Sequence, residues 1–363
     1  MADQQNWKLD LETYIRQGEP SQAEKSVAWQ TAIGLQDVDG LKTSEYLLET
    51  AKEHIEGNID MPAARKRIQS YYEERKDRQD VEDGTMEADQ VAVRIAELLG
   101  EKTFQFSPAA YINVHKRLFT GVFPHAGQLR TYNITKKEWV LNGETVYYAS
   151  YDSIRETLDY DFGQEKKFSY ENVSVMDAVK HIASFASGIW QIHPFCEGNT
   201  RTTAVFIIQY LKTFGFKVNN DVFADNSWYF RNALVRANYN DLQNGIHATT
   251  EFLELFFENL LMGAKHELKN RYLHIDYGRI SPAKSAEIEF SKCKNCTLDC
   301  TFEELAVLKA IAENPHITQK TLAAVLGKSE RTIKAKTVAL QEKGYIRRKN
   351  GKRNGYWELL VTI

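Results

Sequence analysis

Two amphipathic helical patterns joined by a short turn most constrain the fold of this chain. Apolar residues recur at helical spacing from 175 to 192 and again from 200 to 214. Gly215 follows the second pattern at the position of a helix C-cap. We therefore predict two packed helices, Val175–Ile192 and Thr200–Phe214, which hold the turn between them in a fixed geometry.

The turn itself carries the residues with the clearest chemical roles. It has the sequence His-Pro-Phe-Cys-Glu-Gly-Asn-Thr-Arg from position 193 to 201. Gly198 and Asn199 lie at the N-terminus of the second helix. Their backbone N–H groups therefore have no partner within the helix and can bind a phosphate. Arg201 adds a planar set of donors, and Glu197 is a candidate Mg²⁺ ligand. His193 has an ordinary pKa of ~6.5, which suits a general base.

This stretch resembles the signature of the Fic family, His-Pro-Phe-x-(Asp/Glu)-Gly-Asn-Gly-Arg-x-x-Arg. The resemblance extends to Leu118-Phe119 and to 126–130, and overall it covers about 107–263. It implies a protein adenylyltransferase that moves AMP from ATP to a Ser, Thr or Tyr hydroxyl of a target protein or of the chain itself. By the resemblance His193 is the base and Glu197 holds Mg²⁺. The nucleotide-binding residues it implies are Gly198, Asn199, Thr200 and Arg201.

Two positions depart from the family pattern and leave alternatives open. Thr200 replaces the second motif Gly, and Ala204 replaces the second Arg, which binds the terminal phosphate of ATP in the family. We favour an active transferase because the other motif residues are retained. The alternatives are a nucleotide-sensing DNA-binding regulator with a degenerate Fic core, and a Fic enzyme that transfers a different phosphate-linked group. Tyr229 is a candidate contact for the nucleotide base, and a buried core position is an equal alternative.

The N-terminal region contains two candidates for the family's inhibitory pattern, (Ser/Thr)-x-x-x-Glu-(Gly/Asn). Glu56 matches the end of the pattern, although Lys52 stands where Ser or Thr is expected. Asp39 is the weaker candidate, with Asp for Glu and Leu35 for Ser. The family's Glu pairs with the Arg that is absent at Ala204, so inhibition does not follow from either match. Helices that only buttress the core are the alternative.

The chain is predicted to be mainly α-helical and to have four parts. These are an N-terminal helical and candidate regulatory region (1–106), a Fic-like core (107–263), a connecting helix and linker (264–300), and a winged helix-turn-helix (301–363). The charged run from 73 to 89 is predicted to be a solvated helix end or linker. An Asn-Gly pair at 142–143 between β-prone runs predicts a β-hairpin, which by the resemblance is the flap that docks the target.

The C-terminal part resembles a winged helix with a basic second helix and wing. Ser329 is a plausible N-cap for a helix that ends near Lys343, and a hairpin begins at Gly344. Basic side chains there fit phosphate contacts along duplex DNA, and protein contacts or dimerisation are the alternative. The DNA-binding candidates are Arg331, Lys334, Arg347, Arg348 and Lys349. We expect core activity to survive deletion of 301–363, because no proposed catalytic residue lies there.

Composition and charge exclude several classes of protein. The net charge is −3, so any nucleic-acid contact must come from a local patch. No signal peptide or membrane-spanning run is recognised, and four cysteines are too few for a disulfide framework. We therefore expect a cytoplasmic protein without a membrane partner; a homodimer is compatible with the sequence. Cys293, Cys296 and Cys300 are expected to be free thiols rather than a zinc site, because a fourth ligand is missing.

Overall fold

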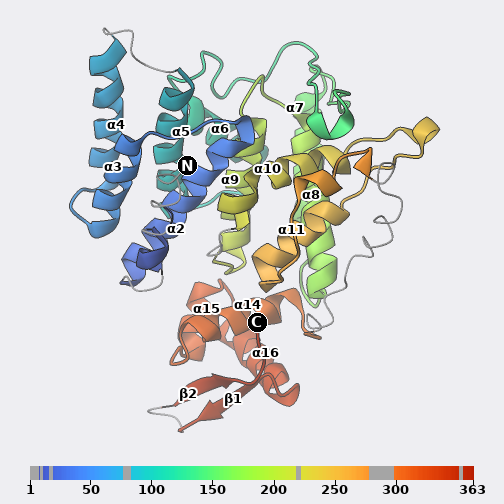
Figure 1. Ribbon diagram of the computed structural model, residues 1–363. Helices are drawn as coiled ribbons and strands as arrows, with labels where there is room; N and C mark the ends of the chain where they lie inside the picture. Colours follow the sequence, from blue (N-terminus) through green and yellow to red (C-terminus); the bar gives the residue numbers. More distant parts are fainter. Residues whose placement is uncertain are drawn as a thin grey trace.

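The computed structural model describes Lys8 and residues 11–15, 19–76, 83–217, 222–277, 298–350 and 355–363. Helices dominate, as predicted, and a smaller C-terminal unit lies against one end of the helical body (Figure 1). The elements are α2 (Pro20–Gly34), η1 (Leu35–Asp39), α3 (Glu45–Glu56), α4 (Met61–Lys76), α5 (Asp83–Gly100), α6 (Pro108–Phe119), η2 (Trp139–Leu141), α7 (Ile154–Lys167), α8 (Val175–Ile192), α9 (Asn199–Thr213), α10 (Val222–Ala237), η3 (Leu242–Asn244), α11 (Glu251–Met262), η4 (Asn270–Tyr272), α14 (Phe302–Glu313), α15 (Gln319–Val325), α16 (Glu330–Glu342), β1 (Ile346–Lys349) and β2 (Tyr356–Leu359). None of the helices within these ranges is long and apolar enough to cross a membrane.

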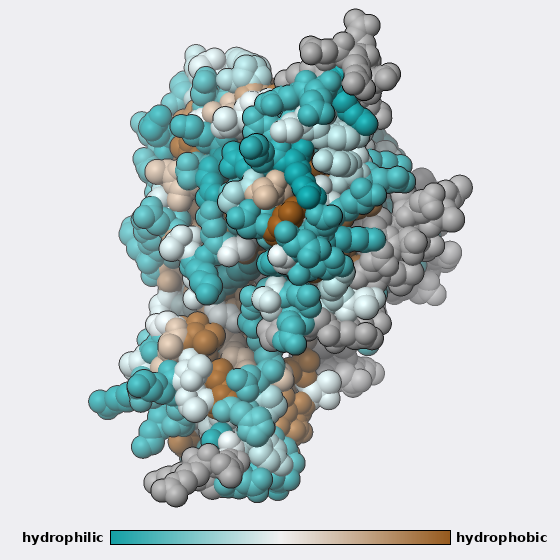
Figure 2. Space-filling view, turned by 90° about the vertical axis from the view of Figure 1, so that its left-hand side faces the viewer, coloured by the Kyte–Doolittle hydropathy of each residue, from teal (hydrophilic) through white to brown (hydrophobic). Residues whose placement is uncertain are grey.

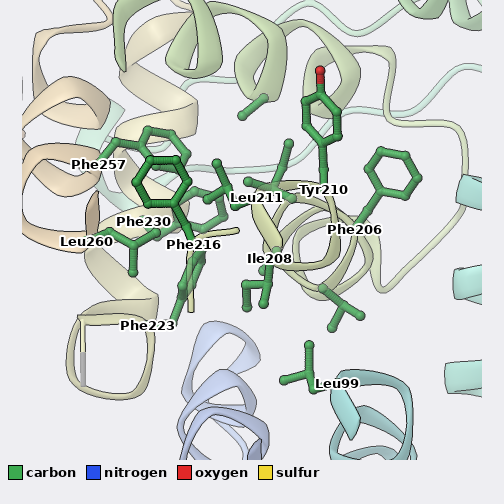
Figure 3. Close-up of a cluster of buried hydrophobic side chains, with 14 of the residues drawn as sticks. Leu99, Phe206, Ile208, Tyr210, Leu211, Phe216, Phe223, Phe230, Phe257 and Leu260 are labelled. Carbon is green, nitrogen blue, oxygen red and sulfur yellow. The ribbon is translucent and has the colours of Figure 1, made fainter. Parts of the chain in front are cut away.

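The two helices around the motif form as predicted. α8 has the predicted bounds, and α9 begins one residue earlier than expected. Every residue from 199 to 211 is buried, which is typical of a central helix. Figure 3 shows Ile208 and Leu211 of α9 within a cluster of buried aromatic and aliphatic side chains. The motif turn is therefore fixed at the N-terminal end of the most buried helix of the core.

The N-terminal helices pack directly on this core. A Cβ at Gly34 would clash with the backbone of Ala224 on α10, so the glycine allows the close approach of α2 and η1 to α10. Ser227 of α10 donates a hydrogen bond to the carbonyl oxygen of Gly34 at 2.8 Å. This contact positions η1 beside the start of α9.

The charged run at 73–89 is not simply a solvated helix end or linker. Its last residues form the first turns of α5, and Asp89 is fully buried. The Asp89 carboxylate accepts hydrogen bonds from the Ser44 backbone at 2.8 Å and the Tyr72 hydroxyl at 2.6 Å. A buried carboxylate is tolerated here because neighbouring helices supply its donors.

The predicted β-hairpin at Asn142-Gly143 turns as expected but forms no strands. Both residues have positive φ, 56° and 88°, as a tight turn requires. However, Trp139–Leu141 is a 3₁₀ helix, and 144–150 has no regular structure. The reason is that the consecutive side chains of Val140 and Leu141 are both buried, whereas a half-buried strand alternates. We call residues 132–151 the flap segment.

The region predicted as a connecting helix and linker (264–300) is described only in part, because residues 278–297 lie outside the described residues. Gly263 ends α11 with φ 67°, residues 264–276 contain the short η4 helix, and Tyr277 is helical. The Asn259 side chain holds this chain reversal through two hydrogen bonds with the His266 backbone, at 2.9 and 2.8 Å. Cys293 and Cys296 lie outside the described residues. Cys300 is buried as a free thiol.

The C-terminal unit is a winged helix, as predicted. β1 and β2 pair antiparallel and form the wing. Phe302 of this unit packs against Phe214 and Phe216 of the core, with ring centroids 5.4 and 4.7 Å away, and its N–H bonds to the Val173 carbonyl at 2.9 Å. In Figure 2 this unit forms the smaller lobe, on which apolar residues are visible. The winged helix is therefore packed on the core through an aromatic contact.

Candidate active site

His193 lies at the end of α8 in a left-handed backbone conformation, with φ 47° and ψ 58°. The residue is only 2% exposed, and the Tyr148 ring of the flap segment covers the imidazole at a centroid distance of 4.1 Å. Neither ring nitrogen has a hydrogen-bond partner among the described residues. Burial, and then the positive charge of Lys136, hold the pKa of His193 well below its ordinary value. The imidazole is therefore neutral at pH 7 and able to accept a proton.

Arg130 holds the backbone around His193. Its guanidinium donates to the carbonyl oxygen of His193 at 2.8 Å and to that of Ile192 at 3.3 Å. It also donates to the carbonyls of Tyr132 and Ala149 at the two ends of the flap segment. Burial lowers the pKa of Arg130. Arg130 lies in the segment 126–130 that resembles the Fic family, but the sequence did not predict that it would hold the backbone around His193.

The motif loop is closed by its own side chains. The Asn199 amide accepts from the Phe195 N–H at 3.0 Å and donates to the Phe195 carbonyl at 2.7 Å. Gly198 has φ 73°, and a Cβ there would clash with the Phe119 ring. The loop therefore needs a glycine both for its backbone conformation and for this close contact.

Thr200 makes a packing contact that explains its departure from the family pattern. Its hydroxyl accepts a hydrogen bond from the Trp190 indole N–H at 2.9 Å. A buried indole N–H usually has a partner, and glycine could not supply one. Ala204 is fully buried, so the second departure lies in the packed interior of α9.

Glu197 is the one exposed member of the candidate nucleotide and metal set. Among the described residues no cluster of three His, Cys, Asp or Glu side chains could hold a metal ion. Mg²⁺ does not need such a cage, since it keeps waters and is bound by one or two carboxylates together with phosphate oxygens. The exposed carboxylate at the motif turn fits that manner of binding.

The side chain of Arg201 makes two hydrogen bonds and an ion pair with the N-terminal region, although its Nε makes no hydrogen bond within the described residues. Its Nη1 donates to Gln36 Oε1 at 3.1 Å, its Nη2 donates to Glu87 Oε1 at 2.6 Å, and its Nε lies 2.8 Å from Asp39 Oδ2. Phe119 packs against the guanidinium, 4.8 Å from the ring centroid to Cζ. Asp39 was the weaker inhibitory candidate, and the roles of Gln36 and Glu87 were missed. Glu87 belongs to a charged run of a kind that usually faces solvent.

The structure places Glu56 and Tyr229 away from these contacts. Glu56 is exposed at the end of α3, where it pairs with Tyr14 and with Asn58, the latter at 3.2 Å. Tyr229 is 2% exposed within α10, and burial raises the pKa of its hydroxyl. Glu56 is therefore not among the residues that contact Arg201. Tyr229 is a residue of the hydrophobic core.

The flap segment is fastened over His193 by a buried ion pair. Glu138 is fully buried, and its Oε2 lies 2.7 Å from Nη1 of Arg231 on α10. Tyr148, which covers His193, also donates to Glu138 at 3.4 Å. Burial raises the pKa of Glu138, while Arg231 acts in the opposite direction. The ion pair and the ring contact together close the candidate site.

Some basic residues of the winged helix are exposed to solvent, whereas others are paired with an acidic side chain or packed on an aromatic ring. Arg331 and Lys334 are exposed on α16. Arg347 and Lys349 of the wing both pair with Glu358, each at 2.6 Å. Arg348 lies over the Trp357 ring at 4.8 Å. The exposed face of α16 therefore offers positive charge more freely than the wing does.

Two family models match parts of this chain. Residues 105–211 match the family described as Fic/DOC, and residues 304–347 match winged helix-turn-helix DNA-binding. No curated protein sequence matches the chain significantly. A solved Fic family protein from Desulfovibrio desulfuricans G20 is similar with a TM-score of 0.45 and 14% identity, over 98% of this chain and 95% of that chain. The chain thus carries a Fic/DOC-family domain at residues 105–211, followed by a winged helix-turn-helix at residues 304–347.

Proposed function

We propose that this protein is a Fic-type protein adenylyltransferase, which transfers AMP from ATP to a hydroxyl of a target protein or of itself. The observation that carries the proposal is His193, a buried and neutral imidazole that has no hydrogen-bond partner among the described residues and lies close in the chain to the N-terminus of α9. A base and an anion-binding helix terminus are the two features that this reaction needs. Free thiols at Cys196 and Cys300 fit a cytoplasmic location, which we also propose.

The chemistry follows from the placement of these groups. His193 accepts the proton of the target hydroxyl as its oxygen bonds to the α-phosphorus of ATP. The bond from that phosphorus to the β-phosphate oxygen breaks, and pyrophosphate leaves. The N–H groups at the start of α9 bind the phosphate oxygens, because they lack partners within the helix. Mg²⁺ held by Glu197 would neutralise phosphate charge during transfer.

The closed arrangement supports a regulated enzyme. The resemblance implies that Arg201 binds the nucleotide, yet its guanidinium faces Gln36, Asp39 and Glu87. Nucleotide phosphates would compete with the two carboxylates for the same guanidinium. Before transfer, Arg201 would then have to lose its contacts with η1 and α5. The Tyr148 ring would also have to move away from His193.

Intact-protein mass spectrometry tests the function directly. The full chain is incubated with Mg²⁺ and ATP, alone and with a cell extract, and α-labelled ATP is compared with γ-labelled ATP. Added AMP mass, with label from the α position only, is expected, and His193→Ala should show neither. Another added mass would identify a different phosphate-linked group. Absence of any adduct on the chain or in the extract would contradict the proposal and favour a nucleotide-sensing role.

We also propose that the winged helix binds duplex DNA, because Arg331 and Lys334 are exposed on α16. Binding of the full chain to duplexes is measured by fluorescence anisotropy over a range of salt concentrations. Arg331→Ala with Lys334→Ala should reduce the salt slope by about two, since each phosphate contact contributes about one unit. Arg347→Ala should change it less, because Glu358 already pairs with this side chain. Salt-insensitive binding, no binding, or dimerisation through this face would contradict DNA recognition.

A further inference from the structure

His115 joins three separate segments of the site. It lies on α6, is fully buried, and stacks on the Phe195 ring at 3.7 Å with an interplanar angle of 9°. Its Nδ1 accepts the N–H of Gly127 at 2.9 Å, and its Nε2 lies 3.0 Å from the carbonyl oxygen of Glu197. Both ring nitrogens therefore make hydrogen bonds. Nδ1 bonds to the turn that precedes the flap segment, and Nε2 bonds to the motif loop.

The two partners determine the tautomer of His115. A backbone N–H can only donate, so Nδ1 must be the unprotonated nitrogen. The ring proton then lies on Nε2, and this N–H donates to the Glu197 carbonyl. The imidazole acts as a donor toward the motif loop in its neutral form.

This hydrogen bond has a consequence for the next backbone N–H. The peptide between Glu197 and Gly198 is planar and trans, so its C=O and N–H groups point in opposite directions. When His115 holds the C=O toward α6, the Gly198 N–H is directed to the other side of the loop. The restraint matters because Gly198 has a positive φ and, as a glycine, has many alternative conformations.

We propose that His115 is a positioning residue, which orients the Glu197–Gly198 peptide so that the Gly198 N–H faces the phosphate bound at the start of α9. The proposal rests on the proposed function, and it assigns part of the anion-binding geometry to a side chain outside the motif. His115 itself touches no reacting atom.

Two amide substitutions separate the two hydrogen bonds. In His115→Gln the side-chain NH₂ reaches near the place of Nε2 and can still donate to Glu197. In His115→Asn the amide oxygen reaches near the place of Nδ1 and can still accept from Gly127. Both variants lose the ring that stacks on Phe195, so each is the structural control for the other.

The two variants should differ in transfer but not in stability. Loss of a preorganised donor at such a site slows the chemical step about 100-fold. We expect His115→Asn to lower kcat for AMP transfer by about that factor, with a smaller change in KM. His115→Gln should stay within about threefold of the parent, and the two melting temperatures should fall together. Equal transfer by the two variants, or losses that follow the melting temperature, would overturn the proposal.

Pyrophosphate binding separates this proposal from the proposed function. Isothermal titration with pyrophosphate is performed on the parent chain and on both variants. If the parent transfers no AMP but binds pyrophosphate, the adenylyltransferase assignment fails, whereas weaker binding by His115→Asn than by His115→Gln still supports positioning. If the parent neither transfers AMP nor binds pyrophosphate, the positioning role fails as well.

Discussion

The guanidinium of Arg201 lies 2.8 Å from the carboxylate of Asp39, and the two residues are joined across the boundary between α9 and the N-terminal region. The Arg201 side chain is only 2% exposed but that of Asp39 is 39% exposed, so water screens the attraction from the Asp39 side. Glu87 approaches the same guanidinium from α5. The motif arginine is therefore paired with two acids that lie outside the Fic/DOC domain.

Removing both acids should raise activity. Asp39→Asn with Glu87→Gln leaves Arg201 free for phosphate, and we expect nucleotide affinity and AMP transfer to rise at least about fivefold, the lower end of typical coupling between sites. The matched control is Glu56→Gln, which should change neither quantity, because Glu56 pairs with Tyr14 and Asn58. Transfer rates and calorimetric nucleotide affinities measure the effect. Activation by Glu56→Gln alone would show that the inhibitory contact lies elsewhere.

The partners of Arg201 show what could and could not be predicted from the sequence. The motif turn and its two helices were predicted because cap residues, apolar periodicity and the signature are local in the chain. Gln36 is 165 positions from Arg201, and no local pattern identifies such a contact. Glu56 matched the inhibitory pattern better than Asp39, but the packing of Gly34 on α10 places η1, not α3, at the start of α9.

The flap segment shows a second limit of prediction from sequence. The Asn-Gly pair specified two residues with positive φ, and both are present. Whether the flanking residues form strands depends on a partner backbone and on alternating burial. Here tertiary packing buries Val140 and Leu141 together, so tertiary structure overrides β-propensity.

The pKa of His193 predicts an unusual pH dependence. Because that pKa is lowered well below its ordinary value, the imidazole stays unprotonated as the pH falls through 6.5. We expect kcat/KM for AMP transfer to remain level from pH 7.5 to about 6, whereas a base with an ordinary pKa would already lose activity. Lys136→Met removes a positive charge that disfavours protonation, and should move the acidic limb to higher pH. An inflection near pH 6.5 in the parent enzyme would contradict this environment for the base.

The Glu138–Arg231 pair should control access to His193. Glu138→Gln leaves Arg231, whose side chain is 15% exposed, without its carboxylate; loss of one partner of a fully buried ion pair typically costs about 3–5 kcal/mol of stability, so the cost here should be somewhat smaller. The flap segment should loosen, and His193 should react faster with diethyl pyrocarbonate. Adding Arg231→Met to Glu138→Gln removes the unpaired charge and should recover part of the stability without slowing that reaction. Unchanged reactivity of His193 in both variants would mean that the ion pair does not close the site.

His54 should make the N-terminal region sensitive to acid. Its Nδ1 accepts the Trp29 indole N–H at 3.0 Å, and burial lowers the pKa of His54 to about 4. In the unfolded chain His54 binds a proton as the pH falls below about 6.5, whereas in the folded chain it stays unprotonated until the pH nears 4. Stability is therefore complete above about pH 6.5 and decreases as the pH falls toward 4. Between pH 7.5 and 5 the loss should be about 2 kcal/mol. In His54→Asn the amide oxygen can accept from Trp29 without titrating, so urea denaturation at pH 7.5 and 5 should show a smaller difference than in the parent.

Phe302 changes the expectation for deletion of the winged helix. The sequence predicts that the core keeps its activity without residues 301–363, because no proposed catalytic residue lies there. In the structure Phe302 packs 5.2 Å from the Tyr170 ring, as well as on Phe214 and Phe216. Deletion would expose these core aromatics to water, and we expect the core to melt at a lower temperature even if its chemistry persists.

Phe302→Ala in the full chain isolates this contact. Truncation of a buried phenylalanine typically costs about 3–5 kcal/mol, so this variant should lose stability comparable to that of the deletion. The matched control is Val338→Ala, because Val338 is exposed on α16 and away from the core contact. Calorimetry should show one cooperative transition for the parent and two separate transitions for Phe302→Ala. A core melting temperature that is unaffected by either change would show that the two units fold independently and that the aromatic contact does not couple them.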